Sequence, residues 1–340
     1  MTNEARRRRV SISDVARLAG VAVGTVSNVL NRPEIVAPGT RARVEAAIKE
    51  MSFVPNGVAR QLRVGTITTV GVVVLDIRNP FFTEVARGVE DRLALADYTL
   101  MLASSDDDLD RERKYLQLFE RHGVVGLLVV PSSHDLDHLL EINRRGVRVV
   151  LLDAPAGGSG LSSVSVDDEA GGALAMAHLI ERGHTQVVML NGSHDIRQCA
   201  ARLLGARRAA ESAGLNPDDA VREVRLRVLD SASGAEAMLA LTDAPGGPPP
   251  ALFCVNDLVA VGVQRALRLR GGTALLESVA IVGYDDIDIA SELAVPLTSV
   301  RQPAREMGYR AADLLFAPDS AEIEQVVFVP ELVVRASSDR

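Results

Sequence analysis

From Thr66 onward, short runs of β-branched and other apolar residues alternate with amphipathic helical patterns. Each run has the length of a buried strand. Parallel neighbouring strands need a long crossover connection, usually a helix, so this alternation predicts βαβ units and parallel sheets. We expect strands at residues 70–75, 98–103, 124–130, 147–153, 187–190, 251–255 and 279–282. We expect helices between them, for instance at residues 82–94, 110–121, 169–182 and 202–212.

The charge of the chain is unevenly distributed. The net charge is −8, yet residues 1–65 carry eleven Lys and Arg against five Asp and Glu, and the remaining 275 residues carry 26 against 40. A basic segment of +6 joined to an acidic body of −14 is typical of a protein in which one part meets an anionic polymer. The alternative is an arginine-rich tail without a role, since residues 6–9 supply four of the eleven positive charges.

The basic segment contains three short helical patterns. Ser11 and Asp14 resemble a capping box before the first, and Gly20 ends it, because glycine adopts the left-handed conformation of a helix C-cap without strain. A second pattern begins at Val23 and a third near Pro38. Two short helices joined by a tight turn, with a third behind them, predict a helix-turn-helix unit; a generic three-helix bundle is the alternative.

These patterns resemble the LacI/GalR (lactose/galactose repressor) family of transcription regulators. The head carries ISDVARLAGVAVGTVSNVLNRP and TRARVEAAIKEMSFVPNGVARQLR, and the body carries VGVVVLDIRNPFF, VDDEAGGALAMAHLIERGH, FCVNDLVAVGV and VAIVGYDDIDIA. The resemblance implies a small all-α helix-turn-helix head at residues 1–55, a hinge helix at 56–65 and an α/β body at 66–340. The body is implied to have two lobes with periplasmic-binding-protein-like parallel sheets, with lobe 1 at about 66–160 plus 298–326 and lobe 2 at about 161–297 plus 327–340.

The family resemblance also implies which residues meet DNA. The base-reading positions of the second helix are matched by Val23, Gly24 and Asn28, and the phosphate-holding positions by Thr25 and Ser27. The remaining candidates are Ser11 at the first cap, Asn31 on the DNA backbone, Asn56 and Arg60 in the hinge helix, and Leu62, which matches a leucine inserted into the minor groove.

The head departs from the family pattern at three positions that we can interpret. Ala22 and Ala37 occupy the places of capping serines, and losing such a cap costs about 1 kcal/mol of helix stability. Asn28 occupies the place of a common arginine. Since arginine suits guanine and asparagine suits adenine, we expect a less stable head and an altered half-site.

Polar and aromatic residues gather at the predicted carboxyl ends of the body's strands, where α/β sheets bind ligands. Asp285 is the foremost candidate, because a carboxylate there can accept hydrogen bonds from two ligand hydroxyls. Matching family positions add Asp153, Arg202 and Asn256, although Arg202 has the alternative role of a salt bridge across the cleft. Phe81 and Phe82 stand out in a chain with only 3% aromatic residues. They either stack on a sugar or base or pack beneath the first helix of the body.

Other candidate motifs favour structural roles. His134 and His138 are four residues apart, as in some metal sites, but the stretch reads as a solvated face, and we expect no metal and no cofactor. Asp257 and Asp286 are expected to be helix-capping or hinge residues. The acidic segment 104–113 is expected to provide solvation and a helix cap. No nucleophile motif or phosphate-binding glycine loop is present, so no catalytic residues and no enzyme are predicted.

The sequence therefore predicts a homodimeric, ligand-responsive repressor that binds a near-palindromic DNA operator. A small molecule in the inter-lobe cleft, a sugar, sugar phosphate or nucleoside/purine, would change operator affinity. Two cysteines without metal spacing and the lack of an export signal or membrane span favour a cytoplasmic protein with no membrane partner. The rival functions are a ligand-binding protein of the same body fold without regulatory DNA binding, and an enzyme fused to a DNA-binding head.

Overall fold

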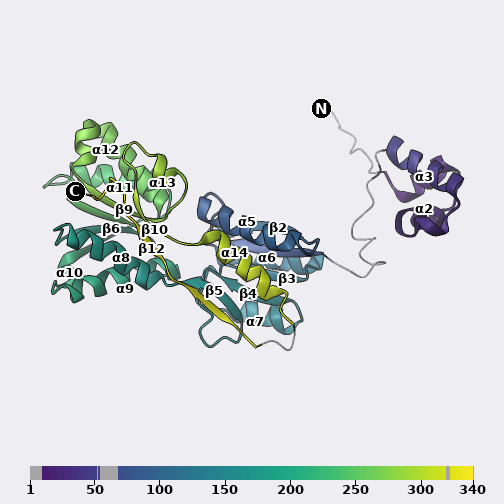
Figure 1. Ribbon diagram of the computed structural model, residues 1–340, viewed down its shortest axis with the longest axis horizontal. Helices are drawn as coiled ribbons and strands as arrows, with labels where there is room; N and C mark the ends of the chain where they lie inside the picture. The colour runs from purple at the N-terminus through teal and green to yellow at the C-terminus, as the bar shows by residue number, and fades with distance from the viewer. Residues whose placement is uncertain (1–9, 52, 54–67, 319–321, 340) are drawn as a thin grey trace, which may run out of the picture. The chain divides into compact units, whose positions relative to one another are not determined.

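The computed structural model describes residues 10–51, 53, 68–318 and 322–339. It divides into two compact units, one before and one from Thr68. In Figure 1 the first unit is drawn in purple and consists of helices, whereas the second unit contains both strands and helices.

The first unit consists of short helices packed around a small apolar core. Its elements are α1 (Ile12–Ala19), α2 (Val23–Asn31), the 3-10 helix η1 (Pro33–Ile35) and α3 (Pro38–Glu50). The capping box is formed, with Asp14 N–H donating to Ser11 Oγ and Asp14 accepting from Ser11 N–H, and Gly20 ends α1 at φ 65°. Val15, Val26 and Val44, one from each α-helix, are fully buried together. The expected helix-turn-helix unit is thus confirmed.

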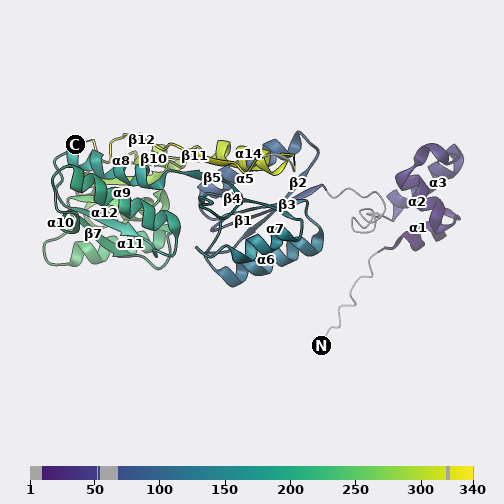
Figure 2. The same ribbon diagram turned by 90° about the horizontal axis from the view of Figure 1, so that it is seen from below.

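The second unit has two six-stranded sheets, one in each lobe (Figures 1 and 2). The lobe 1 sheet has the order β11-β5-β4-β3-β1-β2, and the lobe 2 sheet has the order β12-β10-β9-β8-β6-β7. All neighbouring strands are parallel except β10 and β12. The lobe 1 strands are β1 (Thr69–Val74), β2 (Thr99–Ser104), β3 (Gly126–Val129), β4 (Arg148–Leu152), β5 (Ser162–Val166) and β11 (Gln325–Phe328). The lobe 2 strands are β6 (Val187–Asn191), β7 (Val221–Arg225), β8 (Ala251–Cys254), β9 (Ala280–Asp285), β10 (Thr298–Arg301) and β12 (Glu331–Val333).

Helices cover both faces of each sheet, which is why the central strands are apolar on both sides. The helices of lobe 1 are α5 (Pro80–Ala94), α6 (Leu109–His122), α7 (Asp137–Arg144) and α14 (Ala304–Leu315). Those of lobe 2 are α8 (Asp168–Glu181), α9 (Arg197–Ser212), α10 (Pro217–Ala220), α11 (Ser231–Asp243), α12 (Asp257–Glu277) and α13 (Ile289–Glu292). Val72 and Val74 of β1 face the core beneath α5 and α14, whereas Val73 faces the core on the other side. The predicted fold class is confirmed.

Three crossovers join the lobes, and each lies later in the chain than predicted. Strand β5 pairs with β4 and β11 in lobe 1, so the first crossover follows Val166 rather than residue 160. Strand β10 pairs with β9 in lobe 2, so the second follows Arg301 rather than residue 297. The predicted lobe boundaries are therefore wrong by a few residues, because strand pairing, not local sequence, decides which sheet receives a strand near a crossover. Strand β11 pairs with β5 in lobe 1 through Phe328, so the third crossover lies between β11 and β12 rather than after residue 326.

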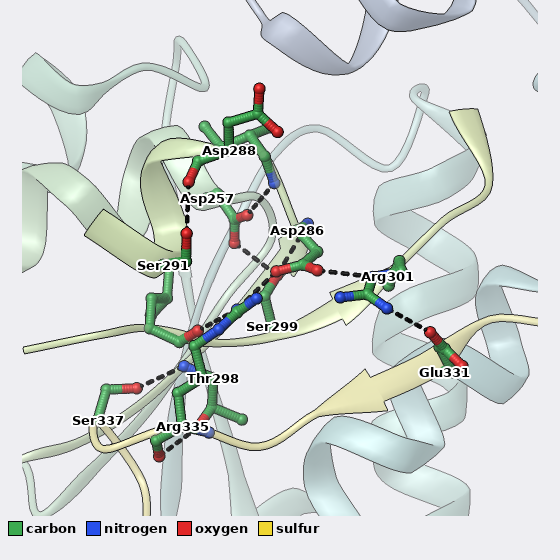
Figure 3. A network of polar contacts seen from close by, with 12 residues as sticks. Asp257, Asp286, Asp288, Ser291, Thr298, Ser299, Arg301, Glu331, Arg335 and Ser337 are labelled. Carbon is green, nitrogen blue, oxygen red and sulfur yellow. Dashed lines mark hydrogen bonds and ion pairs between the residues drawn. The ribbon is translucent and has the colours of Figure 1, made fainter. Parts of the chain in front are cut away.

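A polar network holds the ends of β9, β10 and β12 together beside these crossovers (Figure 3). Asp286 accepts from Arg301 Nε at 2.7 Å and from Arg335 at 2.6 Å, and Arg301 also pairs with Glu331 at 2.7 Å. Asp257 is fully buried and accepts from Ser299 Oγ at 2.7 Å. Asp286 therefore fits the expected hinge role. Asp257 does not cap its helix: it anchors β10.

Within the described ranges, no helix combines the length and apolar character needed to cross a bilayer.

Candidate functional site

A cavity of about 410 Å³ lies between the two lobes. Its wall is formed by residues that follow the carboxyl ends of β1, β2 and β4 in lobe 1 and of β6, β7, β8 and β9 in lobe 2. All six residues predicted to bind an effector line it: Phe81, Phe82, Asp153, Arg202, Asn256 and Asp285. The structure thus brings the predicted set together, as expected for ligand sites of parallel sheets. Their contact with an effector stays a prediction.

Asp285 ends β9 and links the lobes. Its Oδ2 accepts from Asn79 Nδ2 of lobe 1 at 2.9 Å, and its Oδ1 accepts from Gln302 Nε2 at 2.8 Å. Its φ of 102° lies in a region that residues other than glycine rarely adopt, and such strain is concentrated at functional sites. Burial raises the pKa of Asp285 to about 6, against the opposing effect of Arg202.

Asp153 follows β4 and makes a second link between the lobes. Gln198 of α9 donates to both its backbone carbonyl and its Oδ2, each at 2.8 Å. Burial, together with the nearby Asp168, raises the pKa of Asp153 well above its ordinary range. The cavity wall therefore contains two buried carboxyls that already connect one lobe to the other.

Arg202 is held by its own lobe. Its Nε donates to Asp168 at 2.8 Å, its Nη1 donates to the Val255 carbonyl at 2.6 Å, and its guanidinium lies 3.5 Å from the centre of the Tyr284 ring. The alternative of a salt bridge across the cleft is therefore wrong, because Asp168 belongs to α8 of the same lobe. The guanidinium is a rigid part of the cavity wall.

Phe81 and Phe82 take the packing role, one of the two roles that the sequence left open. They begin α5, where Asn79 caps the helix by accepting from Phe81 N–H at 3.0 Å. Both rings are buried in the lobe 1 core in an edge-to-face pair, with 5.0 Å between centroids, and both line the cavity. Each ring therefore packs beneath α5 and also lines the cavity, and its stacking on a ligand stays a prediction.

Asn256 is the N-cap of α12. Its Oδ1 accepts from Val259 N–H at 2.9 Å and its Nδ2 donates to the Leu229 carbonyl at 3.1 Å. It fixes the loop that carries the β8 end of the cavity wall.

Several lining residues were missed by sequence reasoning. They are Asp76, Arg78, Asn79, Asp106, Asp107, Gln198, Arg227 and Gln302. Asp106 and Asp107 lie in the acidic segment that was expected to provide solvation and a helix cap; Asp108 of that segment is indeed the N-cap of α6. Their position directly after β2 could have indicated the cavity, because β1 and β2 are parallel neighbours and their carboxyl ends meet at one edge of the sheet.

In segment 134–138, His134, Asp135 and Asp137 are exposed, as expected of a solvated face, whereas His138 is partly buried. His138 Nε2 lies 2.6 Å from Oε1 of Glu112, whose side chain is fully buried between α6 and α7. Among the described residues, no three His, Cys, Asp or Glu side chains are grouped as a metal site would require.

The outer face of α2 is exposed in the first unit. Val23, Gly24, Asn28 and Asn31 are exposed, whereas Ser27 is buried and accepts from Asn31 Nδ2. Ala22 is the N-cap residue of α2 and Ala37 is that of α3. Neither supplies a side-chain capping bond, as the sequence predicted. Asn56, Arg60, Leu62 and the predicted hinge helix at 56–65 lie outside the described residues.

Residues 11–56 match the family model described as bacterial regulatory proteins, lacI family, and residues 176–338 match a periplasmic binding protein-like domain. The chain is 34% identical over 333 residues to the HTH-type transcriptional repressor PurR of Aliivibrio salmonicida, covering 96% of this chain and 98% of that protein. The chain belongs to the lacI family. It is a ligand-responsive DNA-binding repressor.

Solved structures of this lacI family share the architecture. A complex of the transcriptional regulator CelR with cellobiose is 33% identical, covers 97% of this chain and all of that chain, and superimposes with a TM-score of 0.68. The lac repressor dimer bound to operator and the anti-inducer ONPF is 24% identical, covers 97% and 99% of the two chains, and has a TM-score of 0.75, which supports the shared fold.

Proposed function

We propose that this lacI-family member acts as a homodimer on a near-palindromic operator and that a sugar or sugar derivative in the inter-lobe cavity changes its operator affinity. The head at residues 1–55 reads one half-site through the exposed face of α2, and segment 56–65 links it to the effector-binding body. A two-fold dimer matches two half-sites of a palindrome. The relatives named above include a cellobiose complex and a dimer on operator, which supports this combination.

The observation that carries the proposal is the pair of direct links across the cavity. Asn79 meets Asp285, and Gln198 meets Asp153, so residues of both lobes share one wall. A ligand that binds there interacts differently with the open and closed arrangements of the lobes. Differential affinity is what allows a ligand to shift a conformational equilibrium, and a coupling of about 1–3 kcal/mol changes DNA affinity by about 5–150-fold.

The proposal includes binding without catalysis and a cytoplasmic location. The described residues that line the cavity include no serine, histidine or lysine, and burial raises the pKa of the Cys199 thiol to about 12. A thiol with that pKa is a poor nucleophile near neutral pH. Because the partner is operator DNA, we propose that the protein acts in the cytoplasm, where the chromosome lies.

The test uses the full chain. Selection of bound duplexes from a random pool should return an inverted repeat, and affinity for it should fall steeply as salt rises, because phosphate contacts release counterions. A thermal-shift screen of sugars, sugar derivatives and nucleosides should then find a stabilising ligand that also changes affinity for the selected duplex. Random, non-symmetric sequences, or a cavity ligand without effect on DNA affinity, would overturn the proposal.

A further inference from the structure

Most of the side-chain donor groups in the wall of the cavity already donate to the protein, with Arg227 as the remaining cationic group of the wall. The amides of Asn79 and Gln302 donate to Asp285, and that of Gln198 donates to Asp153. Arg202 donates to Asp168 and to a backbone carbonyl, and Arg78 donates to Asp76 at 2.8 Å. The wall therefore has few donors left for a ligand.

Acceptor atoms of the same wall have no partner. Asp153 and Gln302 are each more than nine-tenths buried, and Oδ1 of Asp153 and Oε1 of Gln302 have no hydrogen-bond partner among the described residues. The amide oxygen of Gln302 can only accept, whereas Asp153 Oδ1 can accept or, because the pKa of this carboxyl is raised, carry its proton. Buried acceptors without partners are rare and are a free-energy cost that a donor can remove. Both side chains line the cavity, so they indicate a ligand that donates hydrogen bonds.

Asp107 is a third acceptor, and it is open to the cavity. Asp106 and Asp107 both have positive φ, 52° and 58°, which turns the chain sharply after β2. Asp106 is engaged by Ser104 and Arg111, whereas no hydrogen bond or ion pair of Asp107 is present in the described part of the chain. The Asp107 side chain is exposed, yet it lines the cavity. Its carboxyl is thus available to a ligand.

The charge of the wall points in the same direction. Five carboxyls line the cavity, from Asp76, Asp106, Asp107, Asp153 and Asp285, against three guanidinium groups, from Arg78, Arg202 and Arg227. Arg78 and Arg202 are paired with carboxylates. Arg227 follows β7 on the opposite lobe from Asp107 and is the group on which an anionic ligand would have to rely.

We propose that Asp107 contacts the effector directly and selects an uncharged or amine-bearing polyhydroxy ligand over a phosphorylated or carboxylated one. This inference rests on the proposed function of the cavity. It narrows the ligand class to molecules that donate several hydrogen bonds to carboxyl and amide oxygens, because phosphate and carboxylate groups would add acceptors and negative charge where the wall already has both.

The test compares matched ligand pairs on the full chain by thermal shift and calorimetry. The pairs are D-ribose and ribose 5-phosphate, D-glucose and glucose 6-phosphate, cellobiose and its phosphate, and adenosine and its monophosphate, with D-glucosamine as an amine-bearing member. Binding is expected from an unphosphorylated member, with its phosphorylated partner weaker by about tenfold or more. Asp107→Asn should weaken the best ligand by about tenfold or more, as expected for loss of a hydrogen bond to a charged group.

Asp97→Asn is the matched control. Asp97 is also exposed and has φ 58°, but it precedes β2 and lies outside the cavity. Asparagine tolerates the left-handed conformation at both positions, so neither variant should change thermal stability much. Equal affinity of the two variants would overturn the role of Asp107.

The remaining outcomes separate this inference from the proposed function. A phosphorylated ligand that binds as tightly as its partner and changes DNA affinity would leave the proposed function in place and overturn the selection against anions. If neither member of any pair binds, the ligand class proposed here is wrong. If the protein also shows no operator preference, the proposed function fails independently.

Discussion

Asn79 and Asp285 are 206 positions apart in the chain, yet Asn79 Nδ2 donates to Asp285 Oδ2 at 2.9 Å and joins one lobe to the other. Asn79 is also the N-cap of α5, and the first turn of that helix carries Phe81 and Phe82. One side chain thus couples the position of the apolar cavity wall to the position of the carboxylate that faces it.

Replacing Asn79 with serine separates these two roles. Serine retains a helix N-cap but is too short to reach Asp285, so Asn79→Ser should lose the link between the lobes. We expect the free energy of unfolding to fall by about 1–3 kcal/mol, because the bond involves a buried carboxyl. Small-angle X-ray scattering without ligand should report a larger radius of gyration. Asn216→Ser, at the exposed N-cap of α10, is the control and should leave the scattering unchanged.

Two neighbouring ion pairs between α8 and α9 should differ greatly in importance. Arg202 with Asp168 is buried, whereas Arg208 with Glu169 is largely exposed. Arg202→Met leaves a buried carboxylate without its partner and should cost about 3–5 kcal/mol of unfolding free energy. Arg208→Met should cost less than about 1 kcal/mol. Urea unfolding of the two variants measures the difference, and equal losses would contradict the assigned burial.

Asp285 should make stability depend on pH. Burial raises its pKa from an ordinary value of 3.8 to about 6, so the folded protein binds this proton more tightly than the unfolded chain does. The stabilising effect of the proton is present at low pH and is lost as pH rises from about 4 to about 6. Asp285→Asn carries no such proton, and its unfolding free energy should decline less over that range than that of the native protein. Parallel pH profiles would show that Asp285 does not titrate there.

Restoring a cap should stabilise the head. Ala22 has the extended backbone of an N-cap, φ −70° and ψ 151°, but no side-chain acceptor. Ala22→Ser supplies an oxygen for the first turn of α2 and should raise the stability of the head by about 1 kcal/mol. Ala46→Ser, on the exposed face inside α3, should instead lower it by roughly 0.5 kcal/mol. Thermal unfolding of the head, monitored by amide hydrogen exchange, measures the stability of both variants. A loss of stability with Ala22→Ser would contradict the interpretation of Ala22 as an N-cap without an acceptor.

Asn28 should determine one base pair of the operator half-site. It is exposed on α2, and asparagine pairs with adenine whereas arginine pairs with guanine. Selection with the native protein and with Asn28→Arg should return half-sites that differ at one position, from adenine to guanine, with about 1–3 kcal/mol of discrimination. Identical half-sites would show that Asn28 does not read a base.

The sequence by itself determined the helix-turn-helix head and the alternation of strands and helices, and it pointed to six of the residues that line the cavity. These features depend on local information: periodicity of apolar side chains, caps and turns, and the rule that parallel sheets bind ligands at strand ends. Asp285 could be placed because it lies at such an end, whereas Asp153, Arg202 and Asn256 were implied by the resemblance to the LacI/GalR family. Phe81 and Phe82 could be placed because aromatic residues are scarce in this chain.

Only the tertiary structure decided which strands belong to which lobe and how each cavity residue is partnered. Strand β5 is rich in serine and β10 adjoins a crossover. The sequence of neither strand therefore indicates which of the two sheets it joins. Likewise, Arg202 could pair with any nearby carboxylate until the packing of α8 on α9 placed Asp168 beside it. The position of the Asp107 carboxyl in the cavity wall also depends on the pairing of β2 with β1, which only the structure shows. Hydrogen bonds between residues far apart in the chain depend on that pairing, and local sequence does not encode it.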